Sequence, residues 1–199
     1  MKYLTICLSI ISINTFSFSQ KTKNEVDSLR IEHLKELKSP EAKVLDEEEI
    51  ADFKGLDYYD FDATYQLVAT FKKDKGKKFE MPTSTERKPV YRRYGYVYFE
   101  LAGQKCTLEV YQNLELKKDK KFKDYLFIPF RDKTSTFATY GGGRYLDAKI
   151  TKGKTILLDF NLAYNPYCAY SYRYSCPIPP VVNTLKVKIE AGEKTPIGH

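Results

Sequence analysis

The stretch YVYFELAGQKCTLEV, residues 96–110, decides the fold. Apolar and polar residues alternate before the turn-forming segment Ala102-Gly103-Gln104-Lys105, and the alternation resumes after it with Cys106, Leu108 and Val110. A period of two predicts strands with one buried face, and the short connection predicts that they pair antiparallel. We therefore expect this stretch to form a β-hairpin.

Short segments with strand-like patterns flank this hairpin on both sides. They are residues 65–72, 125–130, 145–150, 155–160 and 185–190. In the last segment the alternation should turn three side chains inward: Leu185, Val187 and Ile189. Strands and helices do not alternate along the chain, which excludes doubly wound and TIM-barrel architectures. The expected fold is mainly β, an antiparallel sandwich or a partly open barrel.

One or two helices are expected before the β domain. Residues 24–38 carry apolar side chains at helical spacing among charged ones. Asp46, followed three residues later by Glu49, matches a capping box, and Gly55 offers a left-handed stop for a short second helix. The predicted organisation has four parts: a signal peptide at 1–19, an N-terminal helical segment at 20–60, an all-β domain at 61–193 and a C-terminal tail at 194–199.

The N-terminus resembles an export signal. Lys2 precedes an apolar run from residue 4 to residue 13, and Ser17-Phe18-Ser19 places small residues before Gln20 as a cleavage site requires. The run is shorter than the ~20 apolar residues that a membrane span needs, which disfavours an uncleaved anchor. We expect cleavage before Gln20, export to the periplasm or the outside, and no transmembrane segment in the mature protein.

The chain is basic overall, with 33 Lys and Arg against 26 Asp and Glu in 199 residues. Export disfavours nucleic acid as the partner. Two lysine clusters fall in predicted turns: Lys72, Lys73, Lys75, Lys77 and Lys78, and Lys117, Lys118, Lys120, Lys121 and Lys123. We expect them to keep the turns soluble and to protect sheet edges from pairing. Attraction to an anionic surface, such as lipid head groups or acidic glycans, is the alternative.

A connection of 24 residues, 161–184, separates the last two predicted strands. A structureless connection of this length is usually functional or disordered, and its five tyrosines and four prolines argue against disorder. Cys168 and Cys176 bracket its middle, and a disulfide between them would stabilise the fold by roughly 2.6 kcal/mol through the entropy of chain closure. A redox-active pair is the alternative. Cys106 is expected to remain a buried free thiol.

Three glycines, 141–143, precede Arg144. The run is expected to open a strand and lacks the Lys-Ser/Thr of a phosphate loop, so it does not predict a nucleotide site. Backbone N–H groups beside Arg144 would suit an anion such as a carboxylate. The alternative is a sheet corner in which Arg144 pairs with Asp147 or Asp159. With two histidines and no C-x-x-C motif, the sequence predicts no metal site and no cofactor.

Several segments together resemble an uncharacterised family of bacterial and archaeal proteins, domain-of-unknown-function family 1684. They are YGGGRYL at 140–146, DFNLAYNPYCAYSYRYSCPIPP at 159–180, NTLKVKIEAGE at 183–193, FKGLDYY at 53–59, MPTST at 81–85 and FIPFRDKTS at 127–135. The resemblance implies no activity. It does imply that ten positions match the family's motifs: Arg144, Tyr145, Asp159, Asn161, Tyr164, Asn165, Cys168, Tyr170, Cys176 and Asn183.

Most of these positions suggest a shared site. Arg144 begins one predicted strand, while Asp159 and Asn161 end the next, so short connections would bring them to one end of the sheet, with tyrosines as walls. The predicted ligand-binding residues are Arg144, Tyr145, Asp159, Asn161, Tyr164, Asn165, Tyr170 and Asn183. The alternative is a self-satisfied polar network that pins the long connection to the sheet. In a ligand site, Arg144→Ala would abolish binding and leave stability nearly intact.

We predict that the mature domain binds a small polar or anionic ligand, a carbohydrate or a carboxylate. The first alternative is an extracytoplasmic hydrolase-like enzyme that uses carboxylate acid/base chemistry, with Asp132 and Asp159 as candidates. The second is a structural or interaction domain without a ligand. A catalytic triad is disfavoured because His33 lies on the flank of the predicted helix and His199 ends the chain.

Overall fold

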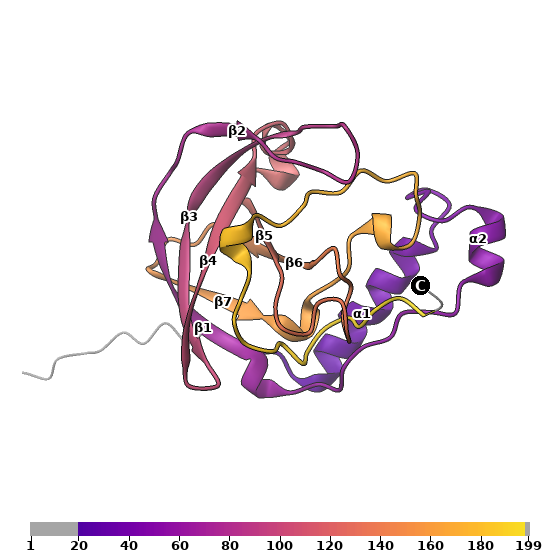
Figure 1. Cartoon of the computed structure of the whole chain (residues 1–199), viewed down its shortest axis with the longest axis horizontal. Coiled ribbons are helices and arrows are strands. Elements are labelled where there is room, and N and C mark those ends of the chain that lie inside the picture. The colour runs from indigo at the N-terminus through magenta and orange to yellow at the C-terminus, as the bar shows by residue number, and fades with distance from the viewer. Residues whose placement is uncertain (1–19, 198–199) are drawn as a thin grey trace, which may run out of the picture.

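The structure is a computed structural model that describes residues 20–197. The seven strands of this part of the chain form one antiparallel sheet that curls into a half-barrel (Figure 1). They are β1 (Gln66–Lys73), β2 (Lys78–Glu80), β3 (Val90–Leu101), β4 (Gln104–Asn113), β5 (Tyr125–Phe130), β6 (Arg144–Lys149) and β7 (Thr155–Asp159). Their order is β6-β5-β4-β3-β1-β7, and β2 pairs with β3 outside this path. The mainly β prediction is confirmed in its partly open barrel form, and the predicted signal peptide lies outside the described residues.

The β3–β4 hairpin forms the centre of the sheet, as the sequence pattern predicts. Ala102 and Gly103 at its tip have φ angles of 50° and 70°. This left-handed pair gives a two-residue turn the twist of the flanking strands. Further back on β3, a bulge lies beside Gly95. The missing side chain of Gly95 lets β1 approach closely, since a Cβ at this position would lie 2.4 Å from the carbonyl oxygen of Lys72.

Two helices precede the sheet: α1 (Lys23–Leu37) and α2 (Glu47–Asp52). Each begins with a capping box, Thr22 with Glu25 in α1 and, as predicted, Asp46 with Glu49 in α2. Helix α1 lies beside β6 and β7, and α2 lies farther from the sheet (Figure 1). The predicted helical segment is thus confirmed as two helices on one side of the half-barrel.

The C-terminal segment completes the core without adding a strand, so the prediction of a strand at 185–190 is wrong. Thr184 makes an isolated bridge with Arg131, and the N–H of Lys133 donates to the carbonyl of Val187 at 3.0 Å, but no ladder follows. The predicted inward alternation is nevertheless confirmed, because three side chains are buried in the main core: Leu185, Val187 and Ile189. The period of two reports burial here rather than strand pairing.

Candidate functional site

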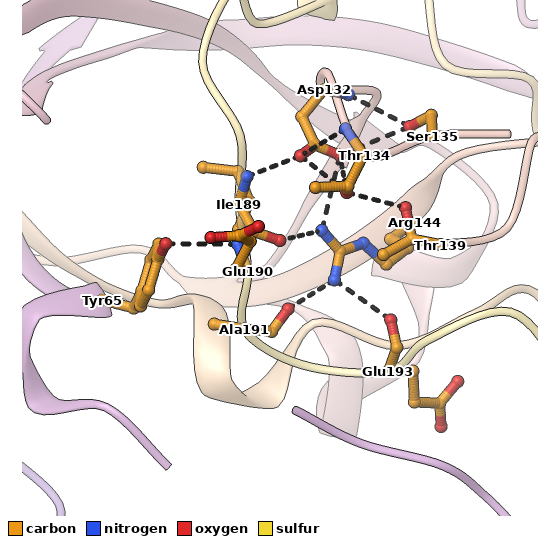
Figure 2. Close-up of polar contacts among 10 residues, drawn as sticks. All are labelled: Tyr65, Asp132, Thr134, Ser135, Thr139, Arg144, Ile189, Glu190, Ala191 and Glu193. Carbon is orange, nitrogen blue, oxygen red and sulfur yellow. Dashed lines mark hydrogen bonds and ion pairs between the residues drawn. The ribbon is translucent and has the colours of Figure 1, made fainter. Parts of the chain in front are cut away.

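Arg144 is the centre of the predicted ligand site, but its guanidinium binds groups of its own chain (Figure 2). Its side chain is fully buried at the start of β6. The guanidinium donates to the carbonyl oxygens of Ile189 at 2.8 Å, Glu193 at 3.1 Å and Ala191, and Nη2 lies 3.4 Å from the Asp132 carboxylate. Its carboxylate partner is therefore Asp132 rather than Asp147 or Asp159, and its other contacts clamp the C-terminal segment.

Asp132 is equally occupied. It accepts hydrogen bonds from the hydroxyl of Thr134 at 2.8 Å, from the N–H of Ile189 at 2.6 Å and from the hydroxyl of Ser135 at 3.3 Å. Burial lowers the pKa of Arg144, and the charge of Asp132 opposes that effect. This geometry is that of the self-satisfied polar network, and it leaves Asp132 no exposed oxygen for acid/base work.

Two more predicted residues act as internal staples. Asn183 is fully buried and bridges β4 and β5, because its amide donates to the carbonyls of Glu109 at 2.9 Å and Pro129 at 2.8 Å and accepts from the Glu109 N–H. The hydroxyl of Tyr145 donates to the carbonyl of Pro177. Both residues fasten the long connection to the sheet.

Asn165 and Tyr170 gather around a buried carboxylate that the sequence pattern did not indicate. Glu193 is fully buried and accepts from the Asn165 N–H at 2.7 Å, the Tyr170 hydroxyl at 2.9 Å and the Tyr58 hydroxyl at 3.0 Å. Nε2 of His33 lies 3.2 Å from Oε1 of Glu193. Burial alone would lower the pKa of His33, but the contact with Glu193 outweighs it and the pKa is raised.

The predicted disulfide is absent: Cys168 and Cys176 are free thiols, and Cys106 is a buried free thiol as expected. The two thiols are nevertheless adjacent, since the N–H of Cys168 donates to Sγ of Cys176 at 3.2 Å. The hydrogen bond with Cys176 outweighs burial and, with Ser84, lowers the pKa of Cys168 to about 6. The pair contributes polar contacts within the connection in place of a covalent closure.

A cavity of about 480 Å³ lies on the other face of β6, beneath α1. Its walls include Arg30, His33, Tyr58, Asp147, Asp159 and Tyr164. This volume lies within the ~300–1,000 Å³ of small-ligand pockets. Two predicted site residues, Asp159 and Tyr164, therefore do line one cavity. Five of the others are buried in the chain's own contacts: Arg144, Tyr145, Asn161, Asn165 and Asn183. The sixth, Tyr170, is half-buried and bonded to Asn165 and Glu193.

Asp147 is a carboxylate of this cavity that the predicted set of site residues did not include. Both the Tyr125 hydroxyl and the Tyr164 hydroxyl donate to its Oδ1, each at 2.7 Å. No hydrogen bond to Oδ2 comes from residues 20–197, and the side chain is open to solvent. The cavity walls displace bulk water, and this desolvation raises the pKa of Asp147 although both phenols oppose it. Asp147 thus presents one oriented, unoccupied acceptor oxygen.

Helix α1 supplies the opposite wall. Arg30 and His33 are three residues apart and share one face of the helix. The Arg30 guanidinium lies 4.5 Å from the ring centroid of Tyr58 and donates to the carbonyl of Asn161 at 3.0 Å. The His33 ring lies 5.5 Å from that of Tyr164. Helical spacing was the only sequence signal that could have paired these two side chains.

Asp159 also lines the cavity, where β7 ends. Its Oδ1 accepts from the N–H of Asn161 at 3.2 Å and from the Asn161 side-chain amide at 3.1 Å. Lys21 lies 3.9 Å from Oδ2. Burial raises the pKa of Asp159 despite the hydrogen bonds from Asn161.

The cavity carries an excess of negative charge. Four carboxylates line it, from Glu32, Glu36, Asp147 and Asp159, against two cations, Lys21 and Arg30, and the imidazole of His33.

Within residues 20–197, no group of three or more His, Cys, Asp or Glu side chains is arranged to hold a metal ion. In the same part of the chain, no helix is long and apolar enough to cross a membrane.

Comparisons with known proteins agree with the family resemblance of the sequence. A family model described as "Protein of unknown function (DUF1684)" matches residues 51–194. The chain is also similar to an uncharacterised protein of Haloarcula marismortui, known from a solution NMR structure. The two are 34% identical with a TM-score of 0.68, and the match covers 88% of this chain and 95% of that chain. No curated protein matches the chain. Neither similarity carries an activity.

Proposed function

Because this chain belongs to the DUF1684 family of proteins of unknown function, we propose its function from its geometry: the cavity between α1 and β6 binds a small neutral carbohydrate. One observation carries the proposal. Asp147 lines the cavity, two phenols hold its Oδ1, and no residue among 20–197 donates to its Oδ2, which remains a hydrogen-bond acceptor. A carboxylate held in this way suits a hydroxyl donor, because an ionised acceptor forms the stronger class of hydrogen bond.

The charge of the walls selects a neutral ligand over an anionic one. A carboxylate ligand would enter a site in which carboxylates already outnumber cations. Arg30 offers it little, because its guanidinium is stacked on Tyr58 and bonded to the Asn161 carbonyl. The aromatic rings of Tyr58 and Tyr164 supply apolar walls with polar tips, which is the mixture that ligand pockets use to orient small polar molecules.

The proposal is tested with matched neutral and acidic sugars. Glucose and glucuronate, and the corresponding disaccharides, are titrated into the purified chain while backbone amide NMR signals are followed. Neutral sugars should shift signals of α1 and β6, and Asp147→Asn should abolish the shifts. Glu100→Gln, an exposed carboxylate at the β3–β4 turn, should leave them unchanged. Stronger binding of glucuronate, or unchanged binding in Asp147→Asn, would contradict the proposal.

A hydrolase built on the same cavity is the second candidate. The raised pKa of Asp147, with an unoccupied oxygen, is the property that a general acid requires. Asp159 also has a raised pKa and lines the same cavity. Turnover of nitrophenyl glycosides that disappears in Asp147→Asn would favour the enzyme. Sugar binding without turnover would favour the binding module. The absence of both binding and turnover would favour a domain without a ligand.

We also propose that the mature protein is exported. The support is the charged start, apolar run and small residues at 1–19. Expression of the full chain in a bacterial host, followed by N-terminal sequencing of the periplasmic protein, should give Gln20 as the first residue. An intact N-terminus in the cytoplasmic fraction would contradict export.

A further inference from the structure

A second cavity, of about 720 Å³, opens where β1 parts from β7. Its apolar walls are Phe71, Tyr94 and Ile150, and lysines surround them. The rings of Phe71 and Tyr94 are stacked, with centroids 6.2 Å apart, and both residues are buried. The feature therefore combines an apolar floor with a basic rim, at the mouth of a half-barrel where ligands commonly bind.

The rim draws its charge from two places in the sequence. Lys72 and Lys73 end β1, while Lys152 and Lys154 come from the β6–β7 turn. Among the residues that the structure describes, no acidic side chain lines the cavity. Among residues 20–197, none of these four lysines takes part in an ion pair. Lysines that only keep a surface soluble are normally interspersed with acidic residues.

A further lysine of the first cluster, Lys75, lies beside this rim. The ammonium groups of Lys73 and Lys75 lie 5.5 Å and 5.2 Å from the ring centroid of Tyr94. Desolvation, and then the charges of Lys73, Arg92 and Lys117, lower the pKa of Lys75. The first cluster therefore places two ammonium groups, of Lys73 and Lys75, over the Tyr94 ring and adds to the positive field of the rim.

We propose that this second cavity binds an anionic amphiphile of the fatty-acid type, with its chain against Phe71 and Tyr94 and its acidic head among the lysines. The apolar floor would contact the hydrocarbon chain of the ligand. The lysines, which form no ion pairs among residues 20–197, would bind its acidic head group. A nucleic acid would use the charge but would leave the buried apolar floor without a role. The edge-protecting role expected for Lys72 and Lys73 does not explain why these two residues and the lysines of the β6–β7 turn surround an apolar cavity.

The probe is sodium dodecanoate below its micellar concentration, titrated by calorimetry at low salt. Three controls separate the contributions: acetate carries the head alone, dodecyl maltoside carries the chain with a neutral head, and a single-stranded oligonucleotide carries phosphate charge alone. We expect dodecanoate to bind and the three controls to bind at least tenfold more weakly. Added salt should weaken dodecanoate binding by screening the rim.

The matched variants are Lys73→Gln with Lys152→Gln on the rim, and Lys186→Gln with Lys188→Gln as the remote control. All four lysines are exposed, so both pairs should fold with unchanged circular dichroism. The rim pair should weaken dodecanoate binding about tenfold, and the remote pair should leave it unchanged. Equal binding of acetate, of the maltoside or of the oligonucleotide, or unchanged binding in the rim pair, would overturn the proposal. Asp147→Asn should not affect it, which keeps the two proposals separable.

Discussion

Arg144 and Asp147 lie three residues apart on the same strand, yet they occupy opposite kinds of environment. Because side chains alternate along a strand, Arg144 faces the C-terminal segment and Asp147 faces the cavity beneath α1. The Arg144 guanidinium is bonded to three backbone carbonyls and a carboxylate. Asp147 has both of its phenolic partners on one oxygen, and no residue among 20–197 donates to the other.

The difference separates structural charge from available charge. An ionisable group whose bonds all end on its own chain stabilises the fold and has nothing left for a ligand. One with an oriented but unoccupied atom in a cavity can bind. On this criterion the candidate site moves from Arg144, where the sequence pattern placed it, to the cavity that contains Asp147, Asp159 and Tyr164.

The largest effect is expected from Arg144→Met. Removing one partner of a buried ion pair costs about 3–5 kcal/mol, because the remaining charge stays buried without compensation. Asp132 would be that charge, and the three carbonyls of the C-terminal segment would lose their donor. Urea unfolding should show the loss in the free energy of unfolding. A loss below about 1 kcal/mol would return Arg144 to the role of a ligand residue.

A smaller loss of folding stability is expected from Gly143→Ala, at the residue directly before Arg144. Gly143 has a φ of 93°, and a Cβ would lie 2.7 Å from the Phe130 carbonyl oxygen and from Cγ of Pro179. Strain of this kind costs about 1–3 kcal/mol. Gly153→Ala is the matched control, because its added Cβ meets nothing closer than 3.9 Å. Equal melting temperatures for the two variants would show that the approach to Arg144 tolerates displacement.

Much of the fold could be predicted because burial leaves a periodic trace. The alternation around residues 96–110 located the central hairpin, and the Asp46 capping box located α2. The same alternation at 185–190 predicted the buried side chains and failed on the strand, because a pattern of apolar residues records which side chains are inside and not where the backbone hydrogen bonds go. β2 was missed because it has three residues, two of them charged.

The site was harder to predict because its parts are distant in the sequence. His33 on α1 and Asp147 on β6 belong to no common motif, and only the folded chain brings them to one cavity. The glycines before Arg144 did indicate an important guanidinium. A cation that binds a ligand carboxylate and one that binds backbone carbonyls leave the same local sequence, so the pattern could not separate the two roles.

Asp147→Asn should cost less than about 1 kcal/mol of stability, in contrast to Arg144→Met. The side chain is open to solvent, and an amide oxygen still accepts from the phenols of Tyr125 and Tyr164. Urea unfolding of both variants under one set of conditions measures the contrast. A loss comparable to that of Arg144→Met would make Asp147 a structural residue and weaken the case for a binding cavity.

The smallest effect on the free energy of unfolding is expected from titration of His33. This residue contacts the buried Glu193 and also lines the cavity. Its pKa is raised by Glu193, so protonation favours the folded state. The stabilisation is fully present below the unfolded value of about 6.5 and is lost as the pH rises through the higher pKa of the folded state. The stability difference between the natural chain and His33→Gln, measured by urea unfolding from pH 5.5 to pH 8.5, should therefore narrow with rising pH. A constant or widening difference would mean that Glu193 holds His33 without its charge, which would leave the imidazole neutral beside Tyr164 in the cavity wall.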